Sequence, residues 1–145
     1  MPGVGKTTVG DLVCRELISK GRDVVHVDGD EVRKLWTGLG YSKKDRLLNA
    51  ERICQYALEF YNDGKDVVCS TVSLYHSIHK LYRILFDRYF EVLLISPLSE
   101  LKIRKPLIYE VLDFSFFEFP KSPHLILDNC TQEESCQKVI DYVGL

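Results

Sequence analysis

The stretch Gly3-Val4-Gly5-Lys6-Thr7-Thr8 decides the fold of this chain. It matches the end of the pattern G-x-x-x-x-G-K-[ST]. In that pattern glycines let backbone N–H groups surround phosphate oxygens, the lysine reaches the β- and γ-phosphates, and the next hydroxyl ligates Mg²⁺. Apolar residues at helical spacing follow directly, so the loop leads into a helix whose positive end faces the anion. A glycine-rich turn that merely caps a helix is the alternative. We expect residues 3–8 to bind ATP, with Thr7 on the metal.

The beginning of this motif is missing from the chain. Its first glycine would lie one position before Met1, and no apolar strand leads into the loop. Folds with such a loop place that strand near the middle of the sheet, so its absence leaves two strand edges unpaired. We expect a truncated start, with a damaged protein as the alternative. The loop would then be held only by its helix, and we expect these 145 residues to be poorly stable and nearly inactive.

Composition indicates one globular domain covering residues 1–145, because 46% of the residues are apolar and 28% are charged. The net charge of −2 argues against a polycationic protein that binds nucleic acid or a membrane surface. No apolar run is long enough to span a bilayer, and the N-terminus does not read as a signal peptide. Five scattered cysteines without metal-binding spacing indicate reduced thiols, mostly buried, in a cytoplasmic protein.

Helical and strand patterns alternate along the chain. This alternation predicts an α/β fold of the P-loop NTPase type, a three-layer sandwich with a mainly parallel sheet flanked by helices and its first strand missing. Gly21 ends the first helix, and Thr131 with Glu134 begins the last as a capping box. The expected helices cover residues 6–20, 43–61, 77–87 and 131–142, and the expected strands cover residues 24–27, 67–69, 90–95 and 125–127.

A second polar cluster, Asp28-Gly29-Asp30 with Arg33, follows the strand at 24–27. Ligands bind at strand ends of this kind in open α/β sheets. Two carboxylates and an arginine there suit an anionic substrate and the Mg²⁺ that accompanies phosphates. The alternative is that Asp28 and Asp30 only form the turn.

The next polar residues complete a longer pattern. Leu39-Gly40-Tyr41-Ser42 is followed by Asp45-Arg46, Asn49 and Arg52. Together with the loop and the D-G-D cluster, this run resembles the adenylyl-sulfate kinase family, with one residue fewer between Arg33 and Tyr41. The resemblance spans nearly the whole chain. It implies transfer of a phosphoryl group from ATP to the ribose 3′-hydroxyl of adenylyl sulfate.

The resemblance also implies roles for individual residues. Lys6, Asp30 and Ser73 would be catalytic, with Asp30 near the accepting hydroxyl as base or Mg²⁺ partner. Asp28 would lie on the substrate side and Tyr41 would pack beside the acceptor. The phosphosulfate group would be held by Arg33, Arg46 and Asn49. For Asp45 and Arg52, a solvated helix face is an equally good interpretation.

Two later segments depart from the family pattern. Ser73-Leu74-Tyr75 has leucine where the family has proline, and His76 and His79 stand where arginines are usual. Neutral histidine cannot replace a guanidinium clamp, so surface histidines without a role are the alternative.

The second departure is the lid over ATP. The lid segment around Arg104 and Lys105 is one residue shorter and lacks an aspartate. Arg104 is nevertheless expected at ATP and Lys105 at the substrate. Phe114, Phe116 or Phe117 could stack on the acceptor base, or could pack in the core.

The expected cofactors are ATP and Mg²⁺, and the expected partner is a small nucleotide, with no nucleic acid and no membrane. The oligomeric state is not defined by the sequence, and a homodimer is compatible with the resemblance. Two other functions remain open. One is a kinase for a related nucleotide, such as cytidine diphosphoramidate in capsule biosynthesis. The other is a non-catalytic nucleotide-binding remnant.

Overall fold

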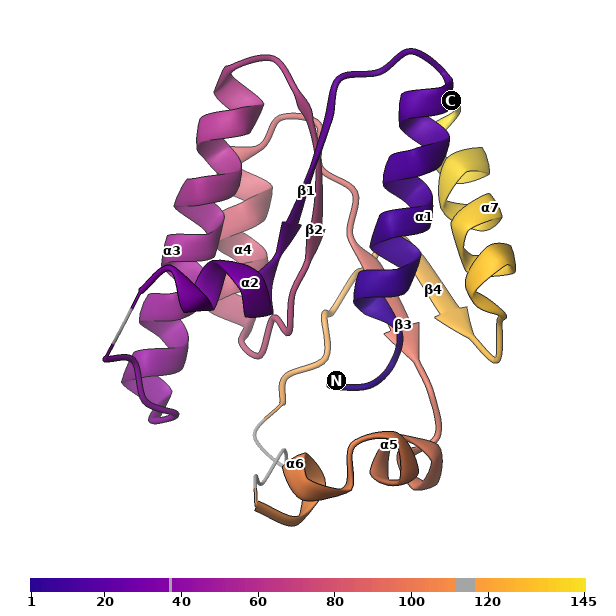
Figure 1. Ribbon diagram of the computed structural model, residues 1–145. Coiled ribbons are helices and arrows are strands. Elements are labelled where there is room, and N and C mark those ends of the chain that lie inside the picture. The colour runs from indigo at the N-terminus through magenta and orange to yellow at the C-terminus, as the bar shows by residue number, and fades with distance from the viewer. Residues whose placement is uncertain (37, 112–116) are drawn as a thin grey trace.

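A computed structural model describes residues 1–36, 38–111 and 117–145 (Figure 1). Helices and strands alternate as the sequence predicts. The helices are α1 (Lys6–Ser19), α2 (Gly29–Lys34), α3 (Lys43–Asn62), α4 (His76–Leu85), α5 (Leu98–Arg104), α6 (Pro106–Val111) and α7 (Gln132–Val143). The strands are β1 (Val24–Asp28), β2 (Asp66–Ser70), β3 (Val92–Ile95) and β4 (Leu125–Asp128).

The four strands form two separate parallel pairs. β1 pairs with β2, from Val24 opposite Asp66 to Asp28 opposite Ser70, and β3 pairs with β4. Within the described residues no strand pairing joins the two pairs, and Figure 1 shows them side by side with α1 in front. All four residues of β3 are only half-buried, although strands of a covered parallel sheet are normally buried on both faces. The fold thus contains the unpaired inner strand edges that the sequence predicts.

Two apolar cores cover the β1–β2 pair. The larger joins α2, α3 and α4 to one face of the pair and includes Val27, Val32, Ile53, Cys54 and Ala57. The smaller lies between α1 and α7 and is built on Val9, Val13, Leu17 and Ile140, with Leu94 of β3 at its margin. α1 packs against β1, β2 and α7, and α7 contacts β4, so these two helices together connect the two strand pairs.

Local capping signals in the sequence are confirmed. Thr131 accepts a hydrogen bond from the Glu134 N–H while Glu134 accepts one from the Thr131 N–H, which is a capping box. Ser42 caps α3 by accepting from the Asp45 N–H, a cap that was not predicted from the sequence. The short helices α2, α5 and α6 were not predicted, because six or seven residues show too little periodicity to be recognised. No helix of the described residues is both long and apolar enough to cross a membrane.

The prediction that most cysteines are buried is wrong. Only Cys14 and Cys54 are buried, and this burial raises the pKa of both thiols to about 11. Cys130 and Cys136 are half-buried, whereas Cys69 is exposed although it lies in a strand. β2 pairs with one strand only, and we attribute the exposure of Cys69 to this open side.

Candidate active site

The phosphate loop ends in a glycine whose conformation few other residues adopt. Gly5 has φ of 97° and precedes the first residue of α1, and its carbonyl accepts a hydrogen bond from the Val9 N–H at 3.0 Å. The chain therefore turns from residues 1–5 into the helix at the point where the motif predicts. Backbone N–H groups at this helix end have no partner inside the helix and are available to an anion.

Asp28 connects the phosphate loop to the second polar cluster. One carboxylate oxygen accepts a hydrogen bond from the Thr7 hydroxyl at 2.6 Å, and the other accepts from the N–H groups of Asp30 and Glu31 at the start of α2. Partial burial opposes the charge of Asp28, but these hydrogen bonds outweigh it and hold its pKa below the ordinary value. The turn-forming interpretation thus holds for Asp28, which at the same time orients Thr7.

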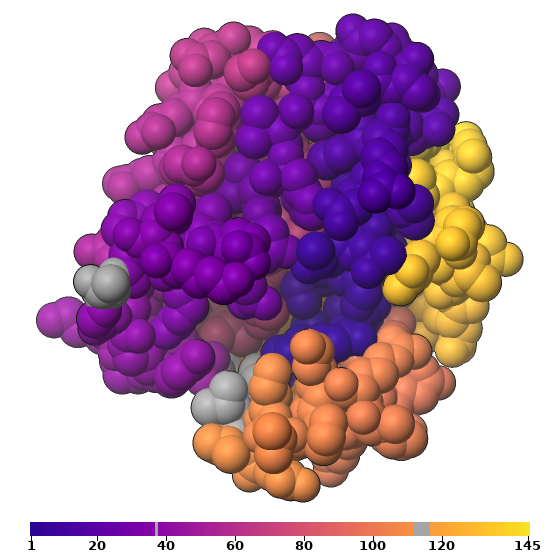
Figure 2. All heavy atoms as spheres, in the orientation of Figure 1, coloured from indigo at the N-terminus to yellow at the C-terminus, as the bar shows by residue number. Residues whose placement is uncertain are grey.

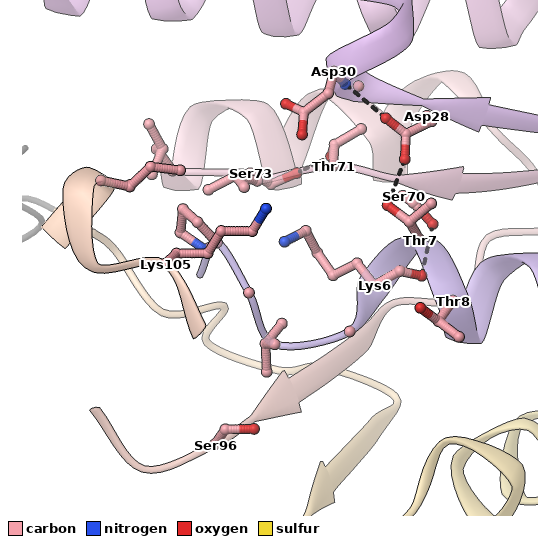
Figure 3. Close-up of a pocket in the computed structure, with 18 of the residues that line it drawn as sticks. Lys6, Thr7, Thr8, Asp28, Asp30, Ser70, Thr71, Ser73, Ser96 and Lys105 are labelled. Carbon is pink, nitrogen blue, oxygen red and sulfur yellow. Dashed lines mark hydrogen bonds between the residues drawn. The ribbon is translucent and has the colours of Figure 1, made fainter. Parts of the chain in front are cut away.

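Two lysines point toward the same space beside the loop. Figure 3 shows the ammonium groups of Lys6 and Lys105 facing one another, with the carboxylate of Asp30 to one side. Burial lowers the pKa of Lys6 to about 8, and the nearby Asp30 and Asp28 oppose this shift only in part. Two cations that converge on one space form a place where a polyanion would be stabilised.

The lid helices α5 and α6 hold the N-terminal residues in position. Arg104 donates to the Gly3 carbonyl at 3.3 Å, and the Tyr109 hydroxyl donates to the Pro2 carbonyl at 2.8 Å. Lys6 in turn donates to the Met1 carbonyl at 2.8 Å. In Figure 2 the orange lid lies directly beneath the indigo N-terminal residues. The loop is therefore tied at both ends, by α1 and by the lid, rather than by its helix alone.

The acceptor end is built around Tyr41. The Arg33 guanidinium donates to the carbonyls of Leu39 and Gly40 and lies 4.5 Å from the centre of the Tyr41 ring. Arg46 donates to the Tyr41 carbonyl at 2.8 Å and also lies over the ring, 5.5 Å from its centre. The two arginines and the tyrosine thus form one cationic, aromatic surface.

Three further residues of α3 differ in their surroundings. The Asn49 side-chain oxygen is buried without a hydrogen-bond partner, so it is available to a ligand. Asp45 accepts from the Ser42 hydroxyl, and Arg52 lies 5.5 Å from the Trp36 ring centre. Neither Asp45 nor Arg52 lines the cavity described below, which favours the interpretation as a helix face outside the site over a role in binding the substrate.

The structure corrects one prediction about the histidines. His79 is not a surface residue: it is buried, and its Nε2 donates to the Ser73 carbonyl at 3.1 Å. His76 contacts Glu118 and the Phe119 carbonyl instead. His79 therefore supports the backbone at Ser73, whereas His76 ties the start of α4 to residues 118–119.

Of the three candidate stacking residues, Phe117 packs against the larger core and the Phe119 ring. Core packing is thus its observed role. Phe114 and Phe116 lie outside the described residues.

A single cavity of about 760 Å³ brings the predicted site residues together. Its walls include the whole phosphate loop, Asp28, Asp30, Arg33, the Tyr41, Arg46 and Asn49 group, Ser73, Arg104 and Lys105. Sequence reasoning missed further residues of these walls, although they follow the carboxyl ends of β2, β3 and β4, where ligands bind in such sheets. The missed residues include Thr71, Ser96, Asn129, Cys130 and Gln132.

Comparison with known proteins points to one family. The model of the family described as adenylylsulphate kinase matches residues 1–110. An adenylyl-sulfate kinase of Bacillus pumilus is 32% identical over 99% of this chain and 81% of its own length. The solved structure of the Mycobacterium tuberculosis APS kinase CysC in complex with AMPPNP and APS has a TM-score of 0.90 and 30% identity, covering 100% of this chain and 94% of that one.

A cytidine diphosphoramidate kinase of Campylobacter jejuni is also similar, with 29% identity, but the match covers only 70% of this chain and 59% of that enzyme. The adenylyl-sulfate kinase matches extend over nearly all of the chain, including both polar clusters and the lid. The chain therefore belongs to the adenylylsulphate kinase family.

Proposed function

We propose that this protein transfers the γ-phosphoryl group of ATP to the ribose 3′-hydroxyl of adenylyl sulfate. The observation that carries the proposal is that the phosphate loop and the acceptor residues line one cavity, in which two lysine ammonium groups converge. Phosphoryl transfer needs little covalent chemistry from a protein. It needs two anionic ligands in line and positive charge at the oxygens that gain charge.

The bond changes assign a role to each charged group. The 3′-oxygen forms a bond to the γ-phosphorus while the bond to the oxygen of ADP breaks, and the hydroxyl proton passes to Asp30. Lys6 neutralises the β- and γ-phosphates, and Arg104 and Lys105 add charge from the lid side. Arg33, Arg46 and Asn49 hold the phosphosulfate end, because guanidinium groups can bond two oxygens at once.

Magnesium fits the oxygen atoms at this site. The Thr7 hydroxyl would hold it, and so would the Asp30 carboxylate where another group takes the hydroxyl proton. Both are the hard oxygen ligands that Mg²⁺ prefers. Among the described residues no group of three or more acidic, histidine or cysteine side chains forms a closed metal site. That fits a Mg²⁺ ion bound mainly through ATP phosphates and water, whose charge would stabilise the transferring phosphoryl group.

A related acceptor nucleotide is the second candidate. It is favoured by the similarity to cytidine diphosphoramidate kinase and by the histidines that replace the family's usual arginines near Ser73. A substrate panel distinguishes the candidates: adenylyl sulfate, cytidine diphosphoramidate and a blank, each with ATP and Mg²⁺. We expect phosphorylation of adenylyl sulfate to be the fastest. Faster turnover of cytidine diphosphoramidate would identify that compound as the acceptor instead. ATP binding without any turnover would indicate a non-catalytic remnant.

The position of the acceptor is tested by Arg46→Ala. A lost charge-assisted hydrogen bond costs about 1.5–3 kcal/mol, so we expect the acceptor KM to rise about tenfold to a hundredfold while the ATP KM changes little. Arg52→Ala is the matched control, because Arg52 lies on the same helix but outside the cavity. Equal effects of Arg46→Ala on both substrates would contradict the proposed acceptor position.

A further inference from the structure

A chain of hydrogen bonds runs behind the phosphate loop from α1 through both strands of the β1–β2 pair. Asp11 of α1 contacts Nδ1 of His26 at 2.8 Å, and Nε2 of His26 contacts the Ser70 hydroxyl at 2.9 Å. Ser70 then donates to the Lys6 carbonyl at 3.0 Å, the bond drawn between them in Figure 3. Ser70 is buried, so this contact is shielded from water. The chain of contacts therefore ends on the backbone of the phosphate-binding lysine.

The sequence of α1 leaves room for this chain of contacts. Gly10 lies inside the helix, where glycine is less stabilising than alanine. A Cβ atom at this position would lie 2.4 Å from the Ser70 oxygen and 2.6 Å from His26 Nε2. Any larger residue would push the histidine and the serine away from α1. The glycine is therefore explained by the space that His26 and Ser70 occupy.

The number of protons decides which of these contacts can be hydrogen bonds. Both ends of the chain, the Lys6 carbonyl and the ionised Asp11 carboxylate, only accept, so the three contacts need three protons between them. Ser70 supplies one, and His26 supplies two only when it is protonated on both nitrogens. A neutral His26 keeps its one proton on Nδ1, because a bare Nδ1 would lie against the Asp11 carboxylate. Its bare Nε2 then accepts the Ser70 proton, which is no longer available to the Lys6 carbonyl.

The groups around His26 are acidic. It faces Asp11 from α1, Asp28 from its own strand, and Asp30 and Glu31 from α2 across a second cavity of about 550 Å³. Tyr56 of α3 also lines this cavity, and no lysine or arginine is among its lining residues in the described part of the chain. The charges that His26 faces there are therefore all negative.

We propose that Asp11, His26 and Ser70 are positioning residues for the phosphate loop, and that the proton on His26 controls whether Ser70 holds the Lys6 carbonyl. The Lys6 carbonyl and the Thr7 N–H belong to the same planar peptide group and point in opposite directions. When Ser70 holds the carbonyl, the Thr7 N–H is fixed toward the nucleotide. When His26 is neutral, that peptide group loses its tie to β2 and nucleotide binding weakens.

Two variants fix the hydrogen bond from Ser70 to the Lys6 carbonyl in opposite states, one always absent and one always present. Ser70→Ala removes the bond to the Lys6 carbonyl whatever the state of His26. His26→Gln places an amide N–H where Nε2–H lies, which leaves Ser70 free to donate to Lys6 at every pH. His124→Gln is the matched control, because that histidine accepts a hydrogen bond from the Glu91 N–H, away from the phosphate loop. Ser135→Ala is the control for loss of a buried serine hydroxyl, on α7.

The measurement is calorimetric titration with Mg²⁺ and ATP, without acceptor, at about pH 6 and about pH 7.5. Lys6, with a pKa of about 8, stays mostly charged in this window. For the parent protein and both controls we expect affinity to fall about threefold to tenfold between the two pH values, the range for one hydrogen bond. We expect His26→Gln to bind ATP at both pH values as tightly as the parent protein does at about pH 6. We expect Ser70→Ala to bind ATP at both pH values as weakly as the parent protein does at about pH 7.5. Protonation of ATP itself affects all the proteins equally.

The outcomes separate this inference from the proposed function, on which it rests for the role of the loop. The proposed control by His26 is wrong if the ratio of ATP affinities at the two pH values is the same in all five proteins. It is also wrong if His26→Gln binds ATP weakly at both pH values. In either case ATP still binds. If the parent protein does not bind ATP at either pH, the nucleotide site itself is wrong. As a second readout, the Thr7 amide signal of ¹⁵N-labelled protein should shift with pH in the parent and not in Ser70→Ala.

Discussion

The donor end and the acceptor end of the cavity rest on different supports. At the acceptor end, α2 and α3 carry the polar residues and bury Val32, Ile53, Cys54 and Ala57 in the larger core. At the donor end, residues 1–5 are held by single hydrogen bonds from Lys6, Arg104 and Tyr109 to backbone carbonyls. The lid that supplies two of these bonds buries only Leu101 among its described residues.

This difference indicates where the molecule moves. Helices fixed by a core keep their side chains in place before a ligand binds, which lowers the entropy lost on binding. A lid with few buried apolar contacts opens at low free-energy cost and can admit and release a nucleotide. We therefore expect changes at the donor end to act on ATP, and changes at the acceptor end to act on the acceptor or on stability.

The largest expected effect belongs to Lys6→Ala. This variant removes the ammonium group that neutralises the β- and γ-phosphates, so ATP should no longer bind at concentrations that saturate the parent protein. Titration with ATP measures the loss. Lys20→Ala is the control, since Lys20 follows the same helix and pairs with Glu16 at 3.6 Å. Unchanged ATP affinity in Lys6→Ala would contradict the assignment of residues 3–8 as the loop that binds the ATP phosphates.

Asp30→Asn tests the proposed base, which lies where the donor end and the acceptor end of the cavity meet. The amide cannot take the proton of the hydroxyl, so turnover should fall at least about a hundredfold while ATP affinity stays within about threefold. Steady-state rates and an ATP titration on the same preparation give both numbers. Glu31→Gln is the neighbouring control, because Glu31 bonds to Lys34 at 2.5 Å instead. Near-parent turnover in Asp30→Asn would move the role of base to another group, with Asp28 the first to test.

The difference in support predicts opposite results for two apolar truncations. Val27 is 1% exposed and Ile103 of the lid is 80% exposed. Val27→Ala should lower the free energy of unfolding by about 2 kcal/mol, from lost burial and a new cavity. Ile103→Ala removes a larger side chain but should change the free energy of unfolding by less than about 0.5 kcal/mol. Urea unfolding measures both, and a comparable loss in Ile103→Ala would mean that the lid is packed against another surface.

The smallest effect is a pH dependence confined to the donor end. Burial disfavours charged Lys6 and lowers its pKa to about 8, so the free protein loses this charge as the pH rises through 8. ATP needs the charged form and must then bind together with a proton. We expect ATP affinity to fall up to about tenfold per pH unit above about pH 8, with little change from this group well below it. Affinity that stays constant up to about pH 9.5 would show that Lys6 keeps its charge in the free protein.

Sequence reasoning located the site better than it described the surroundings of individual side chains. The cavity is lined by the loop from Gly3 to Thr8, by Asp28, Asp30 and Arg33, and by Tyr41, Arg46 and Asn49. Motif spacing and strand ends could predict these residues because they are local features of the sequence. His79 and Cys69 were misjudged, because their burial depends on which segments pack beside them. The short helices α5 and α6 were missed for lack of periodicity.

The sequence alone was enough to identify the parallel α/β class, the capping box at Thr131, the phosphate loop and the family. Each of these is encoded in neighbouring residues through hydrogen-bond geometry and apolar period. Three further features depend on how the whole chain folds: the strands form two pairs, the lid holds Gly3, and Asp11, His26 and Ser70 meet behind Lys6. His26 and Ser70 are 44 positions apart in the chain, and they meet only because the strands that carry them pair in one particular register.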